Sequence, residues 1–131
     1  MQIRIAAKAL AVILEQAERT FPEEACGLLL GVRQHITDAR PTANIASDRT
    51  RHFEIDPQTL VDAHRSARAG GPQVRGDYHS HPGGPAQPSA TDRAMAAGDG
   101  RIWAIVGETD TTFWRDDEAG FARLSYVAAD T

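Results

Sequence analysis

The sequence predicts an α/β protein, a single compact domain in which helices flank a mixed β-sheet. Apolar residues recur at helical spacing over residues 7–17, a continuous apolar run covers residues 26–32, and helix-like and strand-like segments alternate after it. With 131 residues the chain is long enough to bury one hydrophobic core and short for two. We therefore expect one domain over residues 1–131.

The N-terminal elements follow from these patterns. A short strand is expected over residues 2–5, and the helix after it stops before Phe21-Pro22, because the residue before a proline disfavours helical geometry. The apolar run over residues 26–32 has glycine near both ends and is typical of a buried strand, with residues 35–45 as its hairpin partner.

The second half of the chain begins with a helix signal. Asp56-Pro57 is an N-cap followed by proline at the first helical position, and the helix it starts should end at Gly70-Gly71. The remaining elements are expected in this order: a central strand over 74–81, a rigid Pro/Gly-rich loop over 82–88, a helix from 90 to about 98, a strand over 102–106, and two polar strands around 113–114 and over 121–127.

Three side chains between residues 79 and 92 suit one metal ion. Residues two apart on a strand project to the same face, so His79 and His81 can reach one ion while Ser80 points away, and Asp92 comes from the next element. Two imidazole nitrogens and one carboxylate oxygen suit zinc. Three protein ligands leave a fourth position open for water, which indicates a hydrolytic site.

Each of these patterns also has a structural interpretation. A His-x-His pair on a strand is commonly no more than two exposed polar side chains. Ser89-x-x-Asp92 is a helix capping box, with Ser89 as the N-cap and a carboxylate in the first turn. The cap and the metal site are compatible, because a helix that starts at Ser89 would hold Asp92 near the strand end that carries His81.

These residues resemble the signature of the JAMM (MPN+) metalloproteases. The chain matches that signature without departure: His79-x-His81-Pro82 comes first, Ser89 follows His81 after seven intervening residues, and Asp92 follows Ser89 after two. The segment Glu24-Ala25-Cys26-Gly27 resembles the upstream part of the signature. The resemblance implies a cytidine-deaminase-like MPN core and one zinc ion per chain, bound by His79, His81 and Asp92. It also implies that Glu24 is the general acid/base and that Ser89 helps to hold the developing oxyanion.

Two neighbouring glutamates compete for the catalytic role. Alternation along a strand puts Glu24 and Cys26 on one face and Glu23 on the other, but it does not decide which face meets the metal. The spacing in the JAMM family selects Glu24, and Glu23 is expected to be a solvated charge. Cys26 lies in an apolar run and is expected to be a buried small side chain rather than a nucleophile.

The resemblance is greatest to the compact prokaryotic members of the family, and it implies the substrate class. The expected reaction is hydrolysis of an amide or isopeptide bond at the C-terminal Gly-Gly tail of a ubiquitin-like or sulfur-carrier protein. Such a tail can bind by adding a strand to an exposed sheet edge. Two other functions stay open, namely a non-catalytic scaffold with the same fold and the hydrolysis of a small amide.

Charge and hydropathy argue against two other classes of protein, those that bind nucleic acid and those that span a membrane. The net charge is −4 and the basic residues are scattered, which disfavours nucleic acid as a partner. No apolar stretch approaches the roughly 18 residues of a membrane-spanning helix, and the run over residues 9–14 is not followed by a signal-peptide cleavage site. We expect a cytoplasmic protein with no membrane association. The sequence leaves its oligomeric state open.

Overall fold

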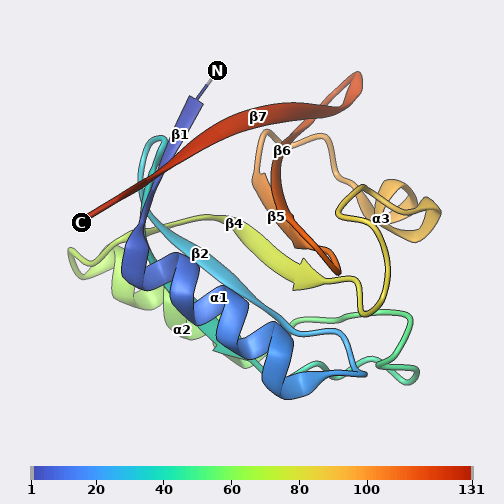
Figure 1. Cartoon of the computed structure of the whole chain (residues 1–131). Helices are drawn as coiled ribbons and strands as arrows, with labels where there is room; N and C mark the ends of the chain where they lie inside the picture. Colours follow the sequence, from blue (N-terminus) through green and yellow to red (C-terminus); the bar gives the residue numbers. More distant parts are fainter. Residues whose placement is uncertain (1, 131) are drawn as a thin grey trace.

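Seven strands and three helices make up residues 2–130, the part of the chain that the computed structural model describes (Figure 1). In chain order they are β1 (Gln2–Ala6), α1 (Ala7–Thr20), β2 (Cys26–Val32), β3 (His35–Thr42), α2 (Pro57–Arg68), β4 (Gln73–Ser80), α3 (Ala90–Met95), β5 (Ile102–Val106), β6 (Thr111–Asp117) and β7 (Gly120–Ala129). None of these helices has the length and apolar character that a membrane span requires.

The strands form one mixed sheet that closes on itself in the order β1-β3-β2-β4-β5-β6-β7. The long strand β7 makes the closure, because its first half pairs with β6 and its second half pairs in parallel with β1. The mixed sheet was predicted, whereas its closure was not. Each strand within residues 2–130 pairs on both sides, but β3 pairs with β1 only at His35 and Ile36. Residues 37–42 of β3 therefore have no partner strand on that side in the described part of the chain, and the addition of a substrate strand to a sheet edge stays a prediction.

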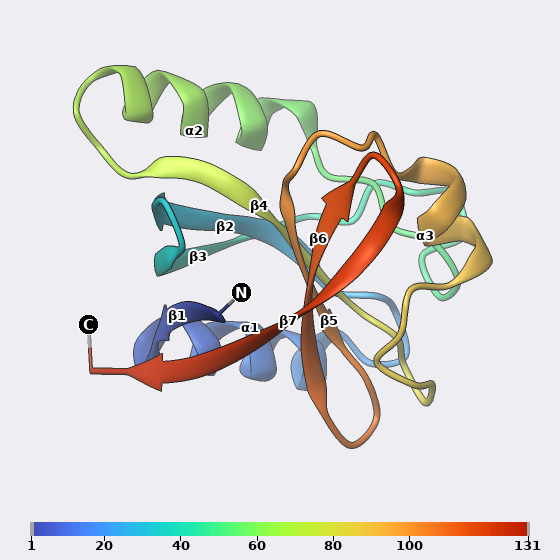
Figure 2. The same cartoon turned by 90° about the horizontal axis from the view of Figure 1, so that it is seen from above.

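Helices α1 and α2 cover opposite faces of the β2-β3-β4 part of the sheet (Figure 2). The alternation along β2 explains this, because Leu29 points into the cluster that includes Ile13 of α1, while Leu28 and Leu30 pack against Ala63 of α2. Both faces of β2 are therefore buried, as a continuous apolar run predicts.

Strand β4, which carries His79, packs closely against β5. A Cβ atom at Gly76 would collide with the carbonyl oxygen of Ile102, so only glycine permits this approach. Helix α2, which precedes β4, begins as predicted, since the Asp56 side chain accepts a hydrogen bond from the backbone N–H of Gln58 at 3.0 Å.

Helix α3 is shorter than predicted. It ends at Met95 rather than near residue 98, because the Asp116 carboxylate accepts hydrogen bonds from the backbone N–H groups of Ala97 (2.9 Å) and Gly98 (3.1 Å). Gly98 also adopts a positive φ of 66°, which a helix does not contain. A buried side chain on β6 thus replaces the hydrogen bonds of a further helical turn.

Candidate metal centre

The end of β4 places two histidines on one face of the sheet. His79 is fully buried and His81, directly after the strand, keeps 13% of its side chain exposed. Ser80 between them points to the other face, where its Oγ accepts a hydrogen bond from the backbone N–H of Ala25 at 2.8 Å. That bond also ties the start of β2 to the end of β4.

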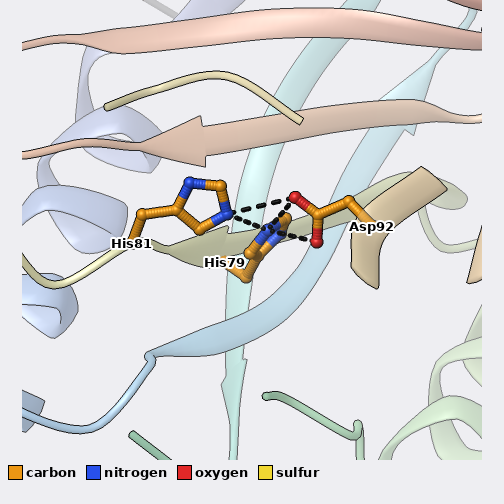
Figure 3. A group of neighbouring side chains, drawn as sticks. All are labelled: His79, His81 and Asp92. Carbon is orange, nitrogen blue, oxygen red and sulfur yellow. Dashed lines mark hydrogen bonds and ion pairs between the residues drawn. The ribbon is translucent and has the colours of Figure 1, made fainter. Parts of the chain in front are cut away.

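The third side chain, Asp92, is held by the start of α3. The predicted capping box is present, since Ser89 Oγ accepts from the backbone N–H of Asp92 at 3.0 Å and Asp92 Oδ2 accepts from that of Ser89 at 2.9 Å. Asp92 is 3% exposed, and its carboxylate points across to the two histidines (Figure 3). The same carboxylate therefore caps the helix and completes the cluster.

The distances within the cluster match a small tetrahedral metal site. The two Nε2 atoms lie 3.0 Å apart, His81 Nε2 lies 3.1 Å from Asp92 Oδ2, and His79 Nε2 lies 3.1 Å from Asp92 Oδ1. Two ligands bound to zinc at its usual distances would stand about 3.3 Å apart. One ligand atom from each residue lies within 4.8 Å of the others, and within residues 2–130 no further His, Cys, Asp or Glu joins this group.

The hydrogen bond at Nδ1 of His81 decides which ring nitrogen carries the proton and which one is left to bind a cation. His81 Nδ1 lies 2.8 Å from the carbonyl oxygen of Pro85, which can only accept, so Nδ1 carries the proton. In the neutral ring, the Nε2 lone pair then faces the carboxylate of Asp92. Two electron pairs at this distance repel each other unless a cation lies between them, and this donor set therefore fits a divalent metal ion.

Burial and hydrogen bonding set the charges of the three groups. Burial lowers the pKa of His79 and favours the neutral ring that metals bind. Burial works against the ionised form of Asp92, but its hydrogen bonds with His79 and His81 outweigh it and hold the pKa of Asp92 well below the usual range. Burial also opposes protonation of His81, yet its bonds to Asp92 and Pro85 raise its pKa overall.

An aromatic wall surrounds His79. The Phe53 ring stacks on it at 4.3 Å between centroids, and Trp103 meets it edge-on at 5.8 Å. Nothing in the sequence indicated a role for Phe53, which lies in a segment without periodicity. The wall excludes water from one side of the cluster, and His79 Nδ1 is buried with no hydrogen-bond partner among residues 2–130.

Glu24 precedes β2 at the same end of the sheet as the cluster. It is 7% exposed, and no hydrogen bond within the described chain reaches its carboxyl group. Its backbone is held by hydrogen bonds with the carbonyl oxygen of Arg49 (2.7 Å) and the side chain of Asn44 (3.1 Å). Burial raises the pKa of Glu24 to about 7, with the charge of Asp92 adding to the rise and that of His81 opposing it.

Neither Glu23 nor Cys26 offers the buried carboxyl group that Glu24 provides. The side chain of Glu23 is 43% exposed and forms an ion pair with Arg49 at 3.2 Å. Cys26 is 2% exposed, and burial raises the pKa of its thiol to about 12. The thiol therefore stays protonated and unreactive at neutral pH, as the sequence predicted for a buried cysteine.

Two curated relatives are similar to part of this chain. The desampylase of Haloferax volcanii is 35% identical over 109 residues, which are 79% of this chain and 77% of that protein. The probable TtuB-protein conjugate cleaving protease of Thermus thermophilus is 34% identical over 74 residues, 56% of this chain and 49% of that protein.

Solved structures share the fold. A protein from Desulfitobacterium hafniense superposes with a TM-score of 0.87 at 26% identity, covering 100% of this chain and 94% of the other. A JAMM protein, described as a metalloprotease-like zinc site in the proteasome and signalosome, superposes with a TM-score of 0.61 over 97% of this chain and 99% of the other, and at 21% identity it shows the fold alone.

The family assignment rests on most of the chain. Residues 6–117 match the family described as prokaryotic homologs of the JAB domain, and this range contains Glu24, both histidines, Ser89 and Asp92. The chain therefore belongs to the prokaryotic JAB-domain family.

Proposed function

We propose that this chain is a zinc-dependent peptidase that hydrolyses the amide or isopeptide bond at the C-terminal Gly-Gly tail of a ubiquitin-like or sulfur-carrier protein. The observation that carries the proposal is the convergence of His79, His81 and Asp92 within 4.8 Å beside the buried carboxyl group of Glu24. The names of the two curated relatives, a desampylase and a TtuB-conjugate protease, support the substrate class. The domain that carries this activity extends over residues 1–131.

His79, His81 and Asp92 are the proposed ligands of one zinc ion per chain. When bound, zinc supplies Lewis-acid chemistry, which polarises a carbonyl group and makes water a nucleophile near neutral pH. Pro85 keeps the lone pair of His81 on Nε2, and Ser89 keeps the carboxylate of Asp92 directed at the two rings. These two contacts pre-organise the site before a metal ion arrives.

Glu24 is the proposed general acid/base. No hydrogen bond among residues 2–130 reaches its carboxyl group and burial raises its pKa to about 7, so it can both accept a proton from water and return it at neutral pH. The proton taken from the attacking water passes to the leaving amine, and the carbon–nitrogen bond breaks. Such proton transfer contributes about 10² to 10⁴ in rate.

Ser89 is the proposed oxyanion donor. Its Oγ accepts the hydrogen bond of the helix cap, so the hydroxyl proton is still available to donate. That proton can meet the negative charge that develops on the substrate carbonyl oxygen.

A paired substrate assay tests the proposal. The zinc-loaded protein is offered a sulfur-carrier protein with cysteine amide-linked to its terminal Gly-Gly, and in parallel a linked diubiquitin. We expect cleavage after the terminal glycine of the carrier. Cleavage of diubiquitin alone would reject the substrate class and keep the chemistry, whereas inactivity on both, with zinc bound, would favour a scaffold. Turnover of only a small peptide-free amide would favour the third function.

The amino-acid composition supports two further parts of the proposal, the kind of partner and the compartment. The partner is a protein substrate rather than nucleic acid, in keeping with the acidic net charge of −4. The proposed compartment is the cytoplasm, where a single unpaired cysteine such as Cys26 is ordinary.

A further inference from the structure

A groove on the α1 side of the molecule reaches His81, one of the three side chains of the metal cluster. It lies between the second half of α1, the end of β4 and the connection from β5 to β6, and its volume is about 530 Å³. His81 lines it together with its neighbours Ser80 and Pro82. His81 thus borders both the metal cluster and the groove, so the two adjoin at this side chain.

The walls of the groove are largely apolar. Leu14 and Phe21 line it from α1 and from the residue after the helix, and they leave 44% and 63% of their surface exposed. Val106 lines it from the end of β5. Large apolar side chains that stay exposed along one groove indicate a surface that a partner covers.

The rim of the groove is acidic. Glu18 comes from α1, whereas Glu108 and Asp110 come from the connection between β5 and β6, so the carboxylates border the groove from two elements. All three are exposed, and no lysine or arginine is among the lining residues. Within residues 2–130 none of the three takes part in an ion pair.

We propose that this groove binds the segment of the substrate that carries the leaving amine, and that this segment is basic. The inference rests on the proposed function and names the other half of its substrate. In an isopeptide the amine belongs to a lysine, whose methylene groups suit the apolar walls, and basic residues beside it suit the acidic rim. The Gly-Gly on the acyl side has no side chains and can use neither feature.

The test uses conjugates that differ only next to the lysine. A carrier tail is joined through its terminal glycine to the lysine of three peptides, in which arginine, serine or glutamate flanks that lysine. With the zinc-loaded full chain we expect kcat/KM about tenfold higher for the arginine peptide than for the glutamate peptide, mainly through KM. The ratio should shrink as salt screens the exposed charges.

Two matched triple variants separate the effect of the groove carboxylates from the effect of the protein's overall charge. E18Q/E108Q/D110N should bring the ratio within about twofold of one, because three exposed carboxylates supply the attraction. D62N/E118Q/D130N removes three exposed charges outside the groove and should keep the wild-type ratio. Fluorescence anisotropy with the free arginine peptide measures binding without turnover, and it should show the same dependence on the two triple variants.

The outcomes distinguish this inference from the proposed function. If no conjugate is cleaved while the arginine peptide still binds through the three carboxylates, the groove assignment stands and the proposed function fails. If all three conjugates are cleaved at equal rates, or both triple variants behave alike, the groove assignment is overturned and the proposed function stands.

Discussion

Replacing Glu24 by glutamine should make the metal-free protein more stable and the enzyme much slower. Folding raises the pKa of this carboxyl group from 4.5 to about 7, because burial disfavours the charged form. Each pKa unit corresponds to about 1.4 kcal/mol, so the ionised carboxylate costs the folded state about 3 kcal/mol above pH 7. The side chain is 7% exposed, and solvent screening reduces this figure little.

The sign of the pH dependence follows from the raised pKa. Below pH 4.5 the group is protonated in the folded and unfolded states and contributes no penalty. Between pH 4.5 and about 7 the unfolded state ionises first, and stability is lost as the pH rises. Glutamine does not titrate, so E24Q should match the wild type near pH 4 and exceed it by about 3 kcal/mol at pH 8, or about 10 °C in Tm.

The assay is thermal and urea unfolding of chelator-treated protein at both pH values, followed by turnover of the zinc-loaded forms. E24Q should still bind zinc and should lose about 10² or more in kcat. The control is E23Q, which removes only an exposed ion pair with Arg49 and should change stability by less than about 1 kcal/mol. Equal stability of E24Q and wild type at pH 8, or equal loss of turnover in E24Q and E23Q, would refute the assignment of the buried catalytic carboxyl group to Glu24.

Three further predictions concern the metal and the segment that carries Asp92. Purified protein should contain about one zinc per chain and lose activity on chelation; metal analysis that finds none, with no uptake of added zinc, would contradict the enzyme assignment. Ser89→Ala should lose about 1 kcal/mol of stability as an N-cap and also about 10² to 10³ in kcat as an oxyanion donor, so melting and turnover are measured on the same variant. A loss of stability alone would remove Ser89 from the catalytic group. Asp116→Ala releases the backbone of Ala97 and Gly98, and by loosening α3 it should weaken zinc binding about 10-fold or more, as competition with a chelator would measure; unchanged affinity would mean that α3 holds Asp92 without this anchor.

Local signals in the sequence were sufficient for most of the metal cluster. Alternation along a strand predicted that His79 and His81 share a face and that Ser80 points away, and the capping box predicted how Ser89 holds Asp92. These features depend on residues at most a few positions apart, whose hydrogen bonds and side-chain directions are decided within one element. The strand over residues 26–32 and the start of α2 were predictable for the same reason.

The sequence by itself therefore determined the ligand types, their spacing and the elements that carry them. Only the tertiary structure decided what surrounds them: the ring of Phe53 on His79, the burial that raises the pKa of Glu24, the Asp116 carboxylate that ends α3, and the groove along α1. Each of these joins residues distant in the chain, and the closing pair of β1 and β7 joins its two ends. Burial, electrostatic coupling and groove shape depend on how whole elements pack, and no local pattern encodes that packing.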